Sequence, residues 1–159
     1  MDANGQEYLD AMGRLWCVNI GHGRAELAPV AAERMRALAY YQHTAMNRPA
    51  AALAERVNGL LGGDTHVYFV NSGSEANEAA FKFARQYQKQ ERPGEPRYKI
   101  ISRYFAYHGT TLATLSAGGM GERKVKSDPL GGSEFVHVAP RTATVVRSGS
   151  LIHRASPRA

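Results

Sequence analysis

Three features are scarce or missing in this sequence of 159 residues: cysteine, long apolar runs, and acidic residues towards its end. Cys17 is the single cysteine, which excludes an internal disulfide and fits a reducing compartment. No stretch approaches the roughly 18 uncharged apolar residues that a membrane-spanning helix needs. The first residues, with Asp2 and Glu7, lack the basic and apolar regions of a signal peptide. We therefore expect a soluble, cytoplasmic protein with no membrane partner.

The excess positive charge is concentrated in the last segment of the chain. The formal net charge is +6, and the isoelectric point is near 9.7. Through Val138 the chain holds 16 basic and 14 acidic residues, whereas residues 139–159 hold four arginines and no acidic residue. Basicity that comes from a tail is a weak indicator of nucleic-acid binding. We expect no nucleic-acid partner, and salt-dependent DNA affinity that vanishes without residues 139–159 would contradict this.

Apolar spacing predicts strands that alternate with helices. A period near 3.6 indicates helices, and short β-rich runs indicate buried strands. This alternation is typical of an α/β domain with a largely parallel sheet. The tail from Ala139 has no coherent period, so we predict no element there. The predicted helices are residues 26–38, 49–62 and 72–90, the predicted strands are 65–70, 98–102 and 134–138, and a hairpin is predicted over 8–18.

A polar turn at residues 71–74 separates a predicted strand from a predicted helix. Ser72, followed three residues later by Glu75, has the pattern of a capping box that starts the helix at Ser72. The first turn of a helix exposes backbone N–H groups and partial positive charge, which suits a phosphate. Gly73 permits close backbone approach, and Ser72 and Ser74 offer hydroxyl donors. Because capping boxes are common, the spacing alone is equally met by an ordinary capped helix.

Residues 71–79, Asn-Ser-Gly-Ser-Glu-Ala-Asn-Glu-Ala, resemble the phosphate-binding motif of class III aminotransferases, which belong to fold type I of the enzymes that use pyridoxal 5'-phosphate (PLP). The resemblance implies that Ser72, Gly73 and Ser74 bind the cofactor phosphate. It also implies an α/β fold that is the incomplete N-terminal part of fold type I, with a hairpin and helices followed by the first half of the large mixed-sheet domain. The implied segments are an N-terminal segment at 1–48, a partial PLP-binding domain at 49–138, and a basic tail outside the family pattern at 139–159.

Two more segments carry the resemblance. Tyr107-His108-Gly109 is similar to the family's Tyr-His-Gly segment, in which the aromatic side chain covers the cofactor ring. This implies that Tyr107 stacks on PLP and that His108 orients its neighbourhood without being a general base. Residues 13–23 resemble the omega-amino acid–pyruvate and taurine–pyruvate branch, whose tryptophan borders the substrate pocket, so Trp16 is a substrate-side candidate. Taken alone, Tyr107 and Trp16 could each be ordinary packing residues.

The lysine that bonds PLP covalently in this family is not expected within this chain. In the family that lysine, an acidic partner of the pyridine nitrogen and a carboxylate-binding arginine all lie further along, so we assign no catalytic residue. After Val138 the sequence departs from the family, and residues 141–146, back-translated in a shifted frame, read close to the family's Cys-Tyr-Arg-Cys stretch. We hypothesise a frameshift near codons 138–140, which the nucleotide sequence would test. The five lysines are Lys82, Lys89, Lys99, Lys124 and Lys126.

The expected function is PLP-dependent transamination, in which an amino group passes from an omega-amino acid or amine to pyruvate or another keto acid. The implied partners are a small-molecule amino donor and a keto acid, the full-length family is expected to be homodimeric, and no metal site is expected. Without the lysine, the chain alone is expected to be inactive. The alternative is a non-catalytic fragment that binds PLP or phosphate. The amino donor stays open among taurine, β-alanine and other omega-amines, as do the neighbouring ornithine-type, diaminopelargonate-type and aminomutase branches.

Overall fold

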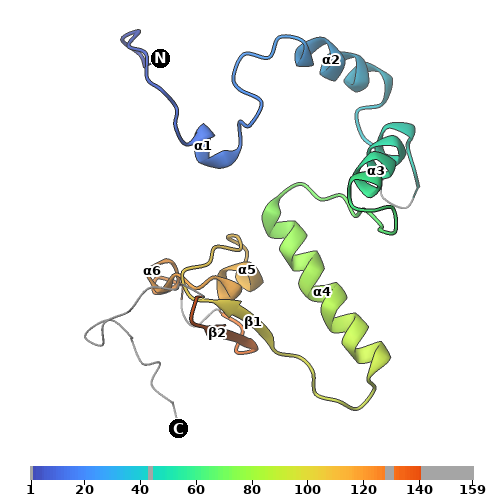
Figure 1. The fold of residues 1–159 in the computed structure, drawn as a ribbon, viewed down its shortest axis with the longest axis vertical. Coiled ribbons are helices and arrows are strands. Elements are labelled where there is room, and N and C mark those ends of the chain that lie inside the picture. The colour runs from blue at the N-terminus through green and yellow to red at the C-terminus, as the bar shows by residue number, and fades with distance from the viewer. Residues whose placement is uncertain (1, 43–44, 128–130, 141–159) are drawn as a thin grey trace. The chain divides into compact units, whose positions relative to one another are not determined.

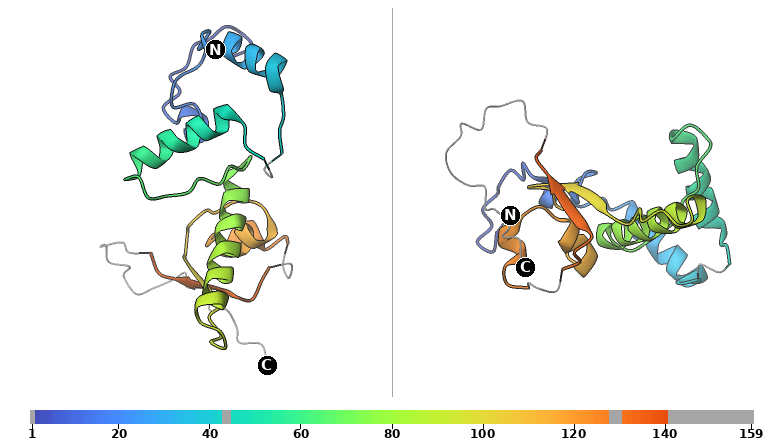
Figure 2. Two further views of the ribbon diagram at one scale, coloured as in Figure 1. Left: turned by 90° about the vertical axis from the view of Figure 1, so that its right-hand side faces the viewer. Right: turned by 90° about the horizontal axis from the view of Figure 1, so that it is seen from below.

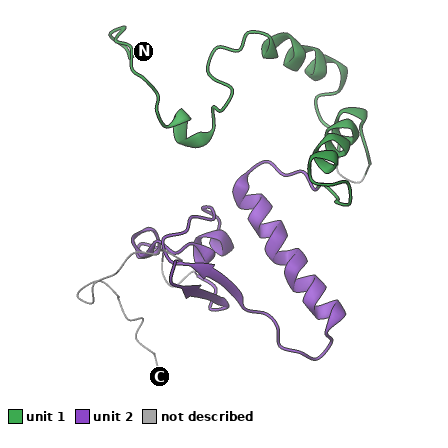
Figure 3. Ribbon diagram, viewed as in Figure 1, with its two compact units in different colours: residues 1–67 green, residues 68–159 purple. Residues whose placement is uncertain are grey.

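The computed structural model describes residues 2–42, 45–127 and 131–140. The chain divides into two units, residues 1–67 and 68–159, and each is considered by itself (Figure 3). The segment boundaries expected from the sequence stay predictions. The frameshift hypothesis concerns residues that lie, apart from Ala139 and Pro140, outside the described part of the chain.

Two predicted helices form in the first unit (Figure 1). Helix α2 covers Leu27–Leu38. Helix α3 covers Arg48–Leu60, and the Asn47 side chain caps its start by accepting a hydrogen bond from the Ala50 N–H at 2.9 Å. Shortly after its end, Gly62-Gly63 has φ values of +99° and +91°, which is the left-handed backbone that glycine adopts at helix ends. Both helices thus form where the apolar spacing predicts them, and a side-chain cap marks the start of α3.

The predicted hairpin over residues 8–18 is wrong. The structure has a single short turn there, α1 (Gly13–Trp16), and no strand. Arg14, Leu15 and Trp16 have φ values of 49°, 58° and 66°, so three consecutive non-glycine residues are left-handed. A left-handed turn cannot supply the extended backbone that a hairpin ladder requires. The apolar residues on either side of Gly13 therefore do not pair.

The second unit contains a parallel pair of strands beside helices. The two strands run parallel with Ile100 opposite Phe135, which confirms the predicted α/β organisation. Helix α4 lies alongside this sheet with α5 next to it (Figure 2). The elements are α4 (Gly73–Glu91), β1 (Ile100–Arg103), α5 (Leu112–Ala117), α6 (Gly121–Lys124) and β2 (Phe135–Val138).

Residues 65–70, predicted as a buried strand, are not a strand in the structure. A strand is completed by hydrogen bonds to a neighbour, and the described residues offer no such neighbour beside this segment. The segment is instead tied to α4 by an edge-to-face contact between the rings of Tyr68 and Phe83, whose centroids are 5.5 Å apart. The β-rich composition was correctly noted, but composition does not supply the partner.

The best-buried part of the second unit is small and polar. Ser102, Thr114, Ser116 and Ala117 are the buried non-glycine residues of the described chain. The Ser102 hydroxyl donates to the Ala117 carbonyl oxygen at 2.6 Å, which links β1 to the end of α5. A second contact joins α4 to β2: the rings of Phe81 and Phe135 lie with their centroids 5.4 Å apart. These contacts place the start of α4 and the loop that follows β1 within one unit.

Candidate cofactor site

Helix α4 begins as the capping-box pattern predicts. Ser72 is the N-cap, and its hydroxyl oxygen accepts a hydrogen bond from the Glu75 N–H at 3.2 Å. The return contact is shifted by one residue, because the Glu75 carboxylate accepts from the Asn71 N–H at 2.6 Å and not from the Ser72 N–H. The carboxylate is thereby held on the side of the turn that precedes the helix.

The first turn of α4 presents donors to open space. Among the described residues, none accepts a hydrogen bond from the backbone N–H of Gly73 or Ser74. A Cβ on Gly73 would meet no atom of another described segment within 4 Å, so a ligand group can approach this turn closely. Two unpaired N–H groups at the positive end of a 19-residue helix suit an anionic group. The residues present therefore fit a phosphate.

The second predicted motif, residues 107–111, lies against this turn. The Ser74 hydroxyl oxygen accepts a hydrogen bond from the Thr110 N–H at 3.1 Å. One helical turn further along α4, the Asn77 side-chain amide donates to the His108 carbonyl oxygen at 2.7 Å. The Thr111 hydroxyl donates to the Glu78 carboxylate at 2.5 Å. The structure therefore brings the two sequence motifs together, although 31 to 36 residues separate the bonded pairs.

Gly109 is the point of closest approach between the two motifs. Its φ is +139°, a region that residues with a side chain rarely adopt. A Cβ at this position would collide with the Ser74 hydroxyl and would lie 2.6 Å from the Thr114 hydroxyl. The structure therefore leaves room only for glycine at this point between α4 and α5.

Tyr107, the predicted ring platform, is 55% exposed. The Arg123 guanidinium of α6 lies over its ring, 5.2 Å from the centroid, which is a cation–π distance. The sequence analysis missed Arg123, Asn77 and Glu78. For Asn77 and Glu78 a signal was present, because they stand three and four residues after Ser74 and share a helix face with it. For Arg123 the sequence offers no such signal.

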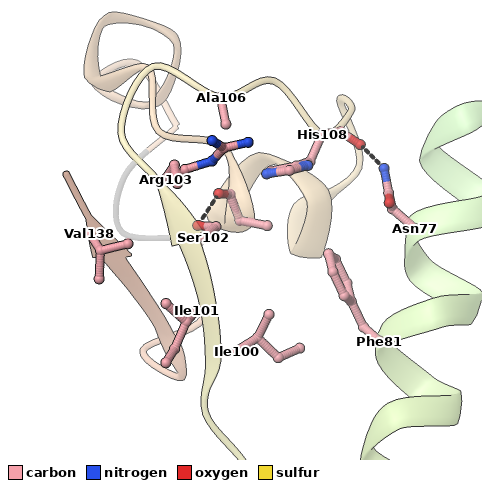
Figure 4. Close-up of a pocket in the computed structure, with 10 residues that line it drawn as sticks. Asn77, Phe81, Ile100, Ile101, Ser102, Arg103, Ala106, His108 and Val138 are labelled. Carbon is pink, nitrogen blue, oxygen red and sulfur yellow. Dashed lines mark hydrogen bonds between the residues drawn. The ribbon is translucent and has the colours of Figure 1, made fainter. Parts of the chain in front are cut away.

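His108 borders a pocket of about 260 Å³ between α4 and β1 (Figure 4). Its Nε2 atom is buried and has no hydrogen-bond partner within the described part of the chain. The pocket is lined on the helix side by Asn77 and Phe81 and on the strand side by residues 100–103. The orienting role expected for His108 stays a prediction.

Trp16 lies in the first unit, at the end of the left-handed turn, and is 76% exposed. The turn is held by Asp10, whose carboxylate accepts from the Arg14 N–H at 3.1 Å and lies 3.6 Å from His22 Nε2. The hydrogen bond from the Arg14 N–H, aided by the Arg14 charge and by His22, holds the pKa of Asp10 below its ordinary value of 3.8. The ionised form of Asp10 therefore favours the turn.

Acidification is expected to loosen this turn. Because the pKa of Asp10 is lowered in the folded chain, its stabilisation is present above the ordinary value of 3.8 and is lost as pH falls through the folded pKa. Fluorescence of Trp16, the single tryptophan, should change with a midpoint below pH 3.8, and Asp10→Asn should abolish that transition. Asp2→Asn is the matched control, since the pKa of Asp2 is also lowered, chiefly by the Gln6 N–H. Identical titrations of wild type and Asp10→Asn would contradict the assignment.

Lys82 and Lys89 lie away from the first turn of α4, and Lys124 is engaged elsewhere. Lys82 and Lys89 are 9 and 16 residues beyond Gly73 on α4, which places them about 13 and 24 Å along the helix axis. The Lys124 amine donates to the Ser116 carbonyl oxygen at 2.9 Å and lies 3.3 Å from His137 Nε2. Within the described ranges, no cluster of His, Cys, Asp and Glu could hold a metal ion, and no helix is long and apolar enough to cross a membrane.

Comparisons with known proteins give the family of this chain. The family model for class III aminotransferases matches residues 1–149. An uncharacterised aminotransferase, YhxA, from Bacillus subtilis is 56% identical over 87% of this chain and 30% of its own length. A hypotaurine/taurine–pyruvate aminotransferase from Paracoccus denitrificans is 40% identical over 80% of this chain and 28% of its own length. A Bacillus anthracis aminotransferase structure superposes with a TM-score of 0.81 and 50% identity, over 87% of this chain and 30% of that one.

The chain thus spans about 30% of the length of the relatives it matches. The match includes the start of α4 and the loop after β1, which are the two segments that the hydrogen bonds of Ser74 and Asn77 join. This chain belongs to the class III aminotransferase family.

Proposed function

We propose that this chain forms the phosphate- and ring-binding part of a PLP-dependent aminotransferase that moves an amino group from an omega-amino acid or amine to pyruvate or another keto acid. Class III aminotransferases are PLP-dependent, and PLP supplies an electron-withdrawing ring that makes the amino-bearing carbon of the substrate reactive. The observation that carries the proposal is the junction between the two motifs, where Ser74 of α4 binds the Thr110 N–H at 3.1 Å.

The proposed phosphate ligands are Ser72, Gly73 and Ser74. Gly73 and Ser74 supply the unpaired backbone N–H groups, and the helix dipole adds to their attraction for an anion. The hydroxyl groups of Ser72 and Ser74 each accept a backbone hydrogen bond, which leaves their O–H groups able to donate. Because these hydrogen bonds already fix the two hydroxyl groups, the side chains need little rearrangement to donate to a bound anion.

Tyr107 is the proposed platform for the ring. Its side chain is about half exposed, and Arg123 covers one face of its ring. The opposite face is then the one on which a flat heteroaromatic ring would stack. Arg123 restricts the movement of the Tyr107 ring and so prepares that face before the cofactor arrives.

The substrate assignment rests on the relatives and on Trp16. A relative that is 40% identical is named for hypotaurine or taurine as donor and pyruvate as acceptor. We extend an omega-amino donor of this kind to this chain, with Trp16 as a residue of the substrate side. The homodimer and the cytoplasmic location expected from the sequence stay predictions.

A second candidate is non-covalent binding of PLP or another phosphate without turnover by this chain alone. It is favoured by three of the five lysines, because Lys82 and Lys89 are more than two turns from the helix start and the Lys124 amine is bound to the Ser116 carbonyl oxygen. The two candidates share the phosphate site and differ in whether PLP becomes covalently attached. Borohydride treatment of the PLP-loaded chain distinguishes them, because only covalently attached PLP is retained after denaturation.

Ser74→Ala is expected to weaken PLP binding roughly 10- to 100-fold, because a hydrogen bond to a charged group contributes about 1.5–3 kcal/mol. The substitution also removes the acceptor for the Thr110 N–H. The measurement is a fluorescence or absorbance titration of the purified chain with PLP. Ser127→Ala is the matched control, since among the described residues the Ser127 hydroxyl donates to the nearby Lys124 carbonyl oxygen alone, and this variant should bind PLP like wild type. Equal affinity of Ser74→Ala and wild type would refute the phosphate site.

A further inference from the structure

One face of α4 holds the ring-binding segment through three side chains. Ser74, Asn77 and Glu78 stand at positions i, i+3 and i+4, so they share one side of the helix. Their partners, in the same order, are the Thr110 N–H, the His108 carbonyl oxygen and the Thr111 hydroxyl. The three contacts span four consecutive residues of the loop. This segment is thus fixed to one face of the helix at three points.

Among the three, the Asn77 contact is nearest to Tyr107. It is partly buried and short, at 2.7 Å from the Asn77 amide nitrogen to the carbonyl oxygen of His108, the residue next to Tyr107 (Figure 4). The Tyr107 ring is about half exposed, and the contact described for it is the Arg123 guanidinium over one face. Its backbone position therefore depends strongly on the contact that its neighbour makes with α4.

The phosphate donors do not depend on Asn77. They are the backbone N–H groups of Gly73 and Ser74 and the Ser72 and Ser74 hydroxyls, all in the first turn or the cap of α4. Asn77 lies one turn further along the helix, where its side chain reaches only the ring segment within the described contacts. The phosphate and the ring of one cofactor are thus bound by parts of the chain that Asn77 connects.

We propose that Asn77 is a positioning residue, which sets the distance between the phosphate-binding turn and the Tyr107 ring through its hydrogen bond to the His108 carbonyl. This rests on the proposed function, because it assumes that the turn and Tyr107 bind the same cofactor. This role predicts a selective effect of removing the Asn77 amide. Binding of PLP, which has both a phosphate and a ring, becomes weaker, whereas binding of inorganic phosphate is unchanged.

Asn77→Leu tests this, since leucine has a similar size, favours helix and cannot donate. The probes are PLP and inorganic phosphate, each titrated into the full chain. We expect PLP affinity to fall about five- to tenfold, the effect of one hydrogen bond and a misplaced ring stack, and phosphate affinity to change less than twofold. The circular dichroism that PLP acquires on binding should also shrink, because it reports the fixed orientation of the ring. Asn77→Gln, which keeps an amide donor, should restore part of both signals.

The outcomes separate the two proposals. If the wild-type chain does not bind PLP, the proposed function fails, and the positioning role fails with it. If wild type binds PLP and Asn77→Leu binds both probes like wild type, only the positioning role is overturned. Equal losses for PLP and phosphate also overturn it, because the phosphate-binding turn itself would then depend on Asn77. If Asn77→Leu does not fold, Asn77→Ser replaces it, because serine is smaller and too short to reach His108. The same two quantities are compared with wild type: the affinity for PLP and the affinity for inorganic phosphate.

Discussion

Gly119→Ala is expected to detach the loop that follows β1, with a loss of stability of about 3 kcal/mol or more. A Cβ on Gly119 would overlap the Arg103 carbonyl oxygen and would lie 2.5 Å from Tyr104 Cα and 2.6 Å from the Phe105 nitrogen. All three are backbone atoms, so no side-chain rotation relieves the overlap. Separation of Gly119 from the loop is the only way to make room.

The backbone around Gly119 explains why this matters for the site. The Phe105 N–H donates to the Gly119 carbonyl oxygen at 3.1 Å, and the Gly119 N–H donates to the Ala106 carbonyl oxygen at 2.8 Å. Phe105 has a φ of +65°, an unfavourable value for an aromatic residue that these two bonds hold in place. Tyr107 comes directly after Ala106, so loss of the two hydrogen bonds to Gly119 also displaces the Tyr107 ring.

Hydrogen exchange measures the effect at the end of β1. The Tyr104 N–H donates to the Val138 carbonyl oxygen at 2.9 Å, and its protection should drop sharply in Gly119→Ala. Gly121→Ala is the matched control: its Cβ would meet nothing within 4 Å, and alanine suits its place in α6. Equal protection of Tyr104 in the two variants would contradict the predicted overlap.

Gly109→Ala is expected to remove PLP binding and to destabilise the contact between α4 and the ring segment by about 2–4 kcal/mol. The new Cβ would meet the Ser74 hydroxyl, a proposed phosphate ligand, and would lie 2.9 Å from Thr114 Cβ. The φ of +139° adds backbone strain to this overlap. The phosphate-binding turn and the Tyr107 segment would therefore be pushed apart.

Gly63→Ala is the control that isolates the backbone cost. Gly63 also has a positive φ, +91°, but a Cβ there would meet nothing within 4 Å, so it should show strain of about 1–2 kcal/mol without steric overlap. PLP titration and exchange of the Thr110 amide, which is bound to Ser74, measure the site. If Gly109→Ala and Gly63→Ala bind PLP equally well, the first turn of α4 and the Tyr107 segment do not need to be in contact for binding, which contradicts the prediction.

The elements predicted correctly depend on interactions within a few residues. The start of α4 follows from Ser72 and Glu75, three residues apart, and the start of α3 follows from Asn47 and the Ala50 N–H. The two parallel strands were also located, because short β-rich runs mark them. The failures have two causes. Residues 65–70 need a neighbouring strand that composition does not provide. The apolar pattern over residues 8–18 does not reveal that residues 14–16 adopt left-handed φ values, which are incompatible with a hairpin.

The sequence by itself indicated the family and the helix cap at Ser72, because motif spacing and capping act over a few positions. It also singled out Ser72, Gly73, Ser74 and Tyr107, whose binding to the cofactor is a proposal. Tertiary structure decided that the two motifs meet, through pairs 31 to 36 residues apart that no local period reveals. It also decided that Gly109 and Gly119 have no room for a side chain, and that Arg123 covers Tyr107. Such contacts depend on where distant segments are placed, which is set by the packing of α4 and α5 against the sheet and not by the residues adjacent in the chain.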